Sequence, residues 1–142
     1  MRIRIQFPTP FTFSVAIPVR ISDINYGGHV GNDRILSIVH EARMAFLAQW
    51  NYTEMNAGGC GLIMADSAIQ YKAEAFYGDT ILVEIAVANI GPVAFDLFYK
   101  LSTTRSEKMI PIAFVKTGMI CFDYEQRKIE NIPSDLLKCL SL

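Results

Sequence analysis

The hydrophobic pattern of this chain changes its period across a short glycine-rich segment near the N-terminus. In residues 11–21 apolar and other side chains alternate, which is the period of a half-buried β-strand. From about Asp33 to Trp50 apolar side chains recur every three to four residues, which predicts one amphipathic helix. Between them, residues 22–32 contain three glycines, two asparagines and an aspartate, which indicates a loop. We expect Asn32 or Asp33 to cap the helix with a side-chain oxygen.

Further strands follow the helix after a flexible connection. Alternating apolar residues separated by turn residues predict four strands, at residues 62–71, 80–90, 93–101 and 110–122. A short C-terminal helix is expected from Ser134 onward. The order of one strand, one helix and four antiparallel strands predicts an α+β fold, in which a curved antiparallel β-sheet wraps a long central helix. We expect residues 1–142 to form a single domain.

The composition bears on the partners of this domain. Charged residues make up 19% of the chain, below the usual quarter, while apolar residues make up 51%. This low charge content indicates that part of the surface is covered by a second copy of the chain. A sheet wrapped on one helix also leaves free edges, so we expect a homodimer, and a homotetramer built as a dimer of dimers is an alternative. The net charge of −1 argues against a nucleic-acid partner.

Neither a membrane-spanning segment nor a signal peptide is expected, because every apolar run is short and interrupted by charged residues or proline. The three cysteines, Cys60, Cys121 and Cys139, are widely spaced and do not form a metal-binding motif. Cys121 lies in an apolar run and is expected to be a buried thiol. These features favour a cytoplasmic protein without a metal or redox cofactor.

Polar side chains are concentrated in the predicted loop between the first strand and the helix. The candidate site residues in this stretch are Asp23, Asn25, Gly28, His29, Val30, Asn32 and Asp33. The paired glycines permit a tight turn and a close approach of ligand to the backbone. The backbone amides that lead into the helix favour negative charge, so we expect them to stabilise an oxyanion. Asp23 either caps the turn or takes part in chemistry, and the two interpretations are left open.

Glu41 is the candidate catalytic acid of the predicted helix. It lies at the flank of the apolar stripe, where we expect a semi-buried carboxylate suited to act as a general base. The alternative is a solvated helix residue. His40 faces away from the stripe and is expected at the surface, while Arg43 is expected to pack or to pair with a loop carboxylate.

Two stretches of the chain carry a resemblance to a known family. The loop Ile21-Ser-Asp-Ile-Asn-Tyr-Gly-Gly-His-Val-Gly-Asn-Asp33, followed by His40-Glu-Ala-Arg43, resembles the 4-hydroxybenzoyl-CoA thioesterases and the related acyl-ACP thioesterases. Their pattern is Asp-x-Asp-x-x-x-His-Val-Asn-Asn, then a helix with Glu-x-Ala-Arg. The segment Tyr71-Lys-Ala-Glu-Ala-Phe-Tyr-Gly-Asp79 is similar to the family pattern Tyr-x-x-Pro-x-x-x-Gly-Asp. The resemblance extends over nearly the whole chain and implies a hotdog fold.

The resemblance also implies an activity. Members of this family are acyl-CoA or acyl-ACP thioester hydrolases, which release a carboxylic acid and a thiol at a site on a dimer interface. Tyr71 and Lys72 are expected to bind the substrate, with the lysine close to the phosphates of coenzyme A.

The chain departs from the family at one decisive position. Four residues before His29, where the family often has its catalytic aspartate, this sequence has Asn25, which cannot act as a base or nucleophile. The favoured hypothesis makes Glu41 the base, with Asn25 and His29 orienting water or the thioester carbonyl. Asp23 or Asp33 is the second option. A non-catalytic acyl-thioester-binding protein is the third, and a hotdog dehydratase is disfavoured because its Gly-His-Phe-Pro loop is absent.

Overall fold

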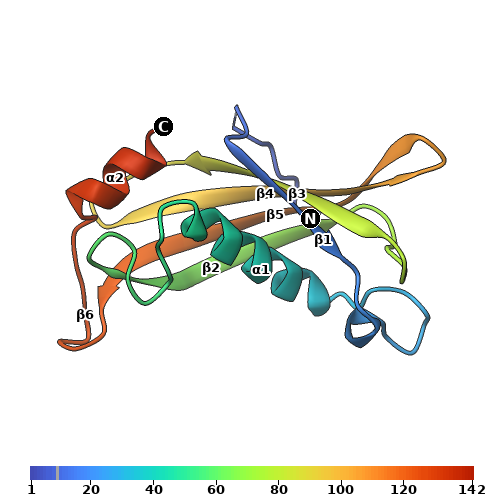
Figure 1. Cartoon of the computed structure of the whole chain (residues 1–142), viewed down its shortest axis with the longest axis horizontal. Helices are drawn as coiled ribbons and strands as arrows, with labels where there is room; N and C mark the ends of the chain where they lie inside the picture. Colours follow the sequence, from blue (N-terminus) through green and yellow to red (C-terminus); the bar gives the residue numbers. More distant parts are fainter. Residues whose placement is uncertain (9) are drawn as a thin grey trace.

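The computed structural model describes residues 1–8 and 10–142, which form one antiparallel sheet, two α-helices and one short 3₁₀ helix (Figure 1). The elements in chain order are β1 Phe13–Pro18, the 3₁₀ helix η1 Ile21–Asp23, α1 Arg34–Ala48, β2 Gly61–Tyr71, β3 Thr80–Ala88, β4 Ala94–Arg105, β5 Lys108–Asp123, β6 Lys128–Ile129 and α2 Ser134–Leu140. The α+β class and the antiparallel sheet are therefore as predicted. α1 has 15 residues and ends at Ala48, two residues short of the expected Trp50.

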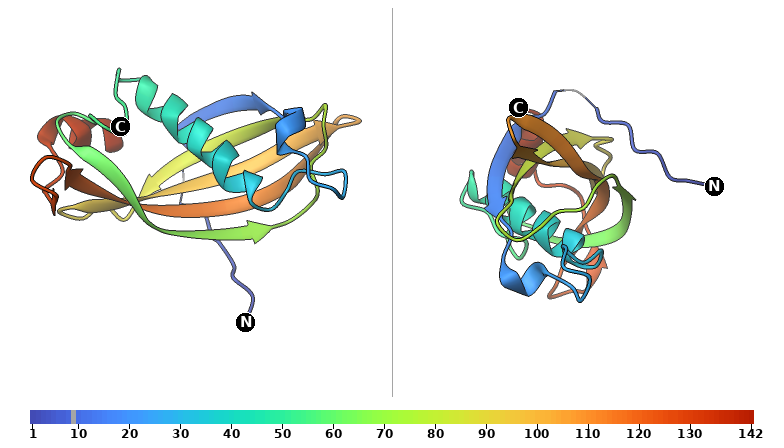
Figure 2. Two further views of the ribbon diagram at one scale, coloured as in Figure 1. Left: turned by 90° about the horizontal axis from the view of Figure 1, so that it is seen from below. Right: turned by 90° about the vertical axis from the view of Figure 1, so that its right-hand side faces the viewer.

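The strand order explains why the loop and the end of β2 come together. The strand order in the sheet is β1-β3-β4-β5-β2, with β6 paired to β5. β2 therefore does not pair with β3, which follows it in the sequence, and it forms the sheet edge opposite β1. The sheet bends around α1, which lies on its concave side (Figure 2). Consequently the N-terminal end of α1 and the C-terminal end of β2 meet at one end of the molecule.

The core lies between the inner face of α1 and the concave face of the sheet. The helix buries Ile38, Val39, Ala42 and Phe46, which follow the predicted helical spacing. In β4 the buried residues Phe95, Leu97, Tyr99 and Leu101 alternate with half-buried ones, which is the predicted period of two. Cys121 is fully buried, as predicted, with its Sγ 3.1 Å from the Sγ of Cys60.

A row of hydrogen-bonded polar side chains crosses this core. The side chain of Arg43 is 6% exposed, and its Nε donates to the Glu54 carboxylate at 3.1 Å. Its Nη1 donates to the Tyr99 hydroxyl at 3.2 Å, and Tyr99 in turn bonds Thr117 at 2.8 Å. Burial raises the pKa of Tyr99, which keeps the phenol protonated and able to donate. The prediction that Arg43 pairs with a loop carboxylate is therefore confirmed.

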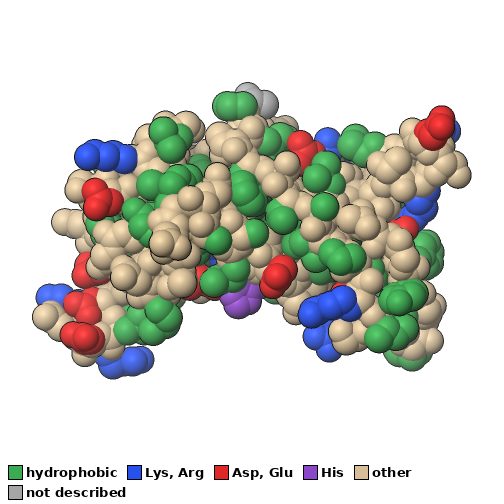
Figure 3. Space-filling model, in the orientation of Figure 1, with side chains coloured by type: hydrophobic (Ala, Val, Ile, Leu, Met, Phe, Trp, Pro, Cys, Tyr) green, Lys and Arg blue, Asp and Glu red, His purple; other side chains and the backbone are tan. Residues whose placement is uncertain are grey.

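The surface of the α1 side is unevenly charged. Charged side chains gather toward the two ends of the long axis, and most of the middle is occupied by hydrophobic and uncharged atoms (Figure 3). His40 is exposed on α1, as predicted. Neither α1 nor α2 combines the length and the apolar character that a bilayer crossing requires.

Candidate active site

The glycine-rich loop is held in a tight turn by its own backbone. The amide of Asn25 donates to the carbonyl of His29 at 2.8 Å. Gly28 has a φ of 82°, a left-handed conformation that residues with a side chain rarely adopt. At Gly27 an added Cβ would lie 3.2 Å from Nε2 of His29, so a larger residue would press on the imidazole. The two glycines thus let the turn fold back close to the His29 ring.

Asn25 and Asp23 organise this loop from within. The Oδ1 atom of Asn25 accepts from the amides of Gly27 at 2.9 Å and His29 at 3.4 Å, so the side chain orders the turn. Asp23 is 2% exposed, and its Oδ2 accepts from the Arg20 amide at 2.9 Å. Asp23 therefore caps the turn in this structure, as one of its two interpretations predicts. Its Oδ1 is buried and finds no hydrogen-bond partner in the described part of the chain.

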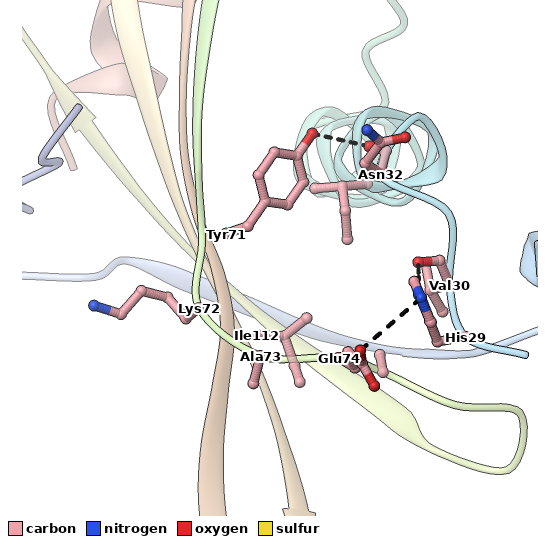
Figure 4. A pocket seen from close by; sticks show the side chains of 10 residues that line it. His29, Val30, Asn32, Tyr71, Lys72, Ala73, Glu74 and Ile112 are labelled. Carbon is pink, nitrogen blue, oxygen red and sulfur yellow. Dashed lines mark hydrogen bonds and ion pairs between the residues drawn. The ribbon is translucent and has the colours of Figure 1, made fainter. Parts of the chain in front are cut away.

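A cavity of about 340 Å³ opens between the loop, the start of α1 and the end of β2 (Figure 4). The cavity is lined by His29, Val30, Asn32, Ile35, Tyr71, Lys72, Ala73, Glu74, Ala75 and Ile112. Five of the expected site residues are in this set: His29, Val30, Asn32, Tyr71 and Lys72. Their convergence from two distant segments of the sequence makes this cavity the candidate active site.

His29 and Glu74 face each other on one side of the cavity (Figure 4). The Nε2 atom of His29 lies 4.0 Å from Oε1 of Glu74. On its other side, Nδ1 of His29 lies 3.1 Å from the Val30 carbonyl. A carbonyl oxygen only accepts, so Nδ1 carries the proton, and in the neutral ring the lone pair is on Nε2, toward Glu74.

The segment that carries Glu74 is anchored to both neighbouring elements. The Val30 amide donates to the Ala75 carbonyl at 2.8 Å, which ties this segment to the loop. Nη2 of Arg105 donates to the Glu74 carbonyl at 2.8 Å, and Nε of Arg105 donates to Asp79 at 3.2 Å. The Arg105 hydrogen bonds hold the pKa of Asp79 below its usual value, so this ion pair persists to lower pH than an ordinary aspartate would allow. These bonds fix where the Glu74 side chain enters the cavity.

The expected oxyanion donors need a correction. The Val30 amide is used by Ala75, and the Gly31 amide donates to the Asp23 carbonyl at 3.0 Å. The amides of Asn32 and Asp33 at the first turn of α1 are therefore the better candidates. Asp33 occupies the N-cap position as expected, but its backbone is helical and its side chain makes no capping hydrogen bond.

Several expected residues lie apart from the cavity or point away from it. Glu41 is exposed on α1, outside the cavity, rather than semi-buried, because the core packs against the opposite face of the helix. The Lys72 stem lines the cavity, but its ammonium points away and lies 5.1 Å from the centroid of the Phe114 ring (Figure 4). Tyr71 spans the cavity edge, and its hydroxyl donates to the Asn32 carbonyl at 3.1 Å.

Glu74 has no role in the sequence-based hypotheses, although the sequence holds a signal for it. In the family pattern Tyr-x-x-Pro-x-x-x-Gly-Asp, Glu74 stands at the position of the proline. A carboxylate in place of an apolar imino acid marks a change of chemistry at that position. The signal becomes clear only when the fold brings Glu74 opposite His29.

Comparisons with known proteins identify the family of the chain. The model of the Thioesterase-like superfamily matches residues 19–140. The chain is 25% identical over 125 residues to a 1,4-dihydroxy-2-naphthoyl-CoA hydrolase from Synechocystis, covering 86% of this chain and 89% of that protein. It is also 25% identical over 128 residues to a protein of the same name from Synechococcus elongatus, covering 87% and 91%.

Solved structures show the same fold. A 1,4-dihydroxy-2-naphthoyl-CoA thioesterase from Synechocystis superposes with a TM-score of 0.80 at 23% identity, covering 91% of this chain and 95% of that one. A variant of 4-hydroxybenzoyl CoA thioesterase in complex with 4-hydroxybenzoyl CoA superposes with a TM-score of 0.80 at 12% identity, covering 90% and 97%. Because the family model covers most of the sequence, this chain belongs to the Thioesterase-like superfamily, which confirms the family resemblance seen in the sequence.

Proposed function

We propose that this protein hydrolyses acyl-CoA thioesters in the cavity between the loop and the end of β2. The observation that carries the proposal is the cavity itself, in which a histidine and a carboxylate face each other beside the start of a helix. Hydrolysis of a thioester requires a base for water, donors for the oxyanion and a pocket for the acyl group. Curated relatives in the same family are named CoA hydrolases, which supports this reaction class.

The chemistry begins with attack of water on the thioester carbonyl carbon. The base removes a proton from the water as the new carbon–oxygen bond forms, and the negative charge moves to the carbonyl oxygen. In this proposal the amides of Asn32 and Asp33 and the dipole of α1 stabilise that charge. The tetrahedral intermediate collapses with cleavage of the carbon–sulfur bond. The thiolate of coenzyme A takes up the proton and leaves, and the carboxylic acid is released.

The size and lining of the cavity favour a compact acyl group. A volume of about 340 Å³ is near the lower end of the range for ligand pockets. Ile35, Ala75 and Ile112 supply apolar walls, and the Tyr71 ring closes one side. An aromatic or short acyl group fits this space better than a long fatty chain. The acyl group is carried by coenzyme A, with an acyl carrier protein as the alternative donor.

Turnover of a panel of thioesters tests the proposal. The panel contains 1,4-dihydroxy-2-naphthoyl-CoA, 4-hydroxybenzoyl-CoA, hexanoyl-CoA, palmitoyl-CoA and an acyl carrier protein loaded with a hexanoyl group. We expect release of free thiol, with the aromatic thioesters turned over faster than palmitoyl-CoA. If no thioester is hydrolysed above the rate in buffer, the proposal is wrong.

A non-catalytic acyl-thioester-binding protein is the second candidate, and Asn25 is the observation that favours it. The side-chain amide of Asn25 orders the loop and has no acid–base function. In that case a non-hydrolysable acyl-CoA thioether would bind tightly while every thioester in the panel stays intact. Turnover of any member of the panel excludes this alternative.

The active unit proposed is a homodimer, with a dimer of dimers as the larger alternative. Within the described chain the edge strand β2 pairs on one side only, with β5. Large apolar side chains are exposed on this edge strand, at Met64 and Tyr71. Sedimentation velocity at micromolar concentration should show a dimer or a tetramer. A single monomeric species would contradict the proposal.

A further inference from the structure

Glu74 is the one carboxylate among the described residues that line the cavity. It reaches the cavity from the segment between β2 and β3, and His29 reaches it from the loop before α1. The 4.0 Å between Oε1 of Glu74 and Nε2 of His29 leaves the carboxylate and the lone pair of the imidazole facing the same space. A water molecule in that space can donate one proton to each of them.

The position of Glu74 is built into the fold. Its own carbonyl accepts from Arg105, and the carbonyl of the next residue, Ala75, accepts from Val30. The first bond fixes the segment to the end of β4, and the second fixes it to the residue after His29. These two hydrogen bonds fix the backbone that carries Glu74 relative to β4 and to the residue after His29, so the two side chains enter the cavity from defined positions.

The other acids considered from the sequence are placed less favourably. Asp23 is buried, and one of its oxygens is committed to the Arg20 amide. Glu41 is exposed on α1 and lies outside the cavity in this chain. Asn25 stands where the family has its catalytic aspartate, and an amide cannot accept the proton of water at a useful rate.

Two departures from the family pattern therefore compensate each other. The loop has lost a carboxylate at Asn25, and the segment after β2 has gained one at Glu74, in place of a proline. Both positions border the same histidine, because Asn25 accepts from the His29 amide and Glu74 faces its ring. Compared with the family pattern, this chain has its carboxylate on the Glu74 side of His29 instead of the Asn25 side.

We propose that Glu74 is the catalytic base of this protein and that His29 positions the attacking water against it. The inference rests on the proposed thioester hydrolysis. Glu74 takes one proton from the water while the water oxygen attacks the thioester carbonyl carbon. The other proton of the water is held by Nε2 of His29. When the carbon–sulfur bond breaks, the proton on Glu74 passes to the departing thiolate, and the carboxylate is regenerated.

The substitution Glu74→Gln tests the assignment, because it keeps the size and removes the basic group. The side chain is 62% exposed, so the variant is expected to fold like the wild type, and its thermal midpoint serves as the check. We expect kcat to fall by about 100-fold or more. The dissociation constant for a non-hydrolysable acyl-CoA thioether should change by less than about threefold. The matched control is Glu125→Gln, an exposed glutamate in the turn after β5.

The pH profile separates a base from a structural residue. In the wild type kcat/KM should fall on the acidic side, because protonation of Glu74 or of His29 removes an acceptor of the water, and Glu74→Gln should lose the part of that fall that Glu74 contributes. A Glu74→Gln variant with kcat within about threefold of wild type would overturn the assignment. The same holds if Glu41→Gln abolishes turnover while Glu74→Gln does not. A wild type that hydrolyses no thioester contradicts the proposed function itself and with it the role of Glu74.

Discussion

Replacement of Arg43 by methionine should lower the free energy of unfolding by about 3 kcal/mol, the lower end of the cost of breaking a buried ion pair. The guanidinium is nearly inaccessible and binds both Glu54 and Tyr99. Without it, the Glu54 carboxylate, of which 21% of the side chain is exposed, loses its buried partner and keeps only the exposed His40. The midpoint of thermal unfolding should fall by roughly 10 °C for a chain of this size. Urea unfolding followed by the fluorescence of Trp50 measures the change.

Two further variants make this prediction specific. Arg34→Met removes an exposed arginine from the first turn of the same helix, and we expect its stability to stay within about 0.5 kcal/mol of the wild type. The double variant Arg43→Met with Glu54→Met removes both charges, so it should be more stable than Arg43→Met alone. Equal stability of Arg43→Met and wild type would mean that water solvates Glu54 without help from the arginine.

Replacement of His29 by alanine should reduce kcat for the best thioester by about 100-fold or more. The imidazole is oriented by the Val30 carbonyl and faces Glu74, so its loss leaves the attacking water with one partner instead of two. The change should appear in kcat rather than in KM, because the ring acts on water and not on the acyl group. Thiol release from acyl-CoA over a range of substrate concentrations measures both constants.

The matched control for this prediction is His40→Ala, which removes the other histidine of the chain. His40 is exposed on α1 and pairs with Glu54, away from the cavity. We therefore expect its kcat to stay close to that of the wild type. A loss of activity as large in His40→Ala as in His29→Ala would show that the effect is not local to the cavity.

Most strands and helices could be predicted from the sequence, because the hydrophobic period of each depends on neighbouring residues. Alternation in residues 93–101 predicted β4, and the structure extends this strand to Arg105 because its pairing with β5 continues to the hairpin turn. Helical spacing predicted α1 to within two residues. The helix ends at Ala48 rather than Trp50, and Asn51 follows with a φ of 63°, a left-handed conformation that turns the chain away from the helix axis.

Only part of the cavity could be predicted from the sequence. The loop from Asp23 to His29 stood out because its polar residues are close together in the chain. Glu74 did not, because 44 residues of helix, connection and strand separate it from the loop. The exposure of Glu41 depends on which elements cover that face of α1, and hydrophobic spacing alone does not reveal this.

The sequence by itself determined the α+β class, the loop before α1 and its histidine, since each follows from neighbouring residues and their spacing. The tertiary structure decided which acid meets that histidine. The strand order places β2 at the sheet edge beside the start of α1, and the bonds from Val30 and Arg105 then fix the segment that carries Glu74. A contact between residues far apart in the chain depends on how the sheet closes around the helix, and no local pattern specifies that closure.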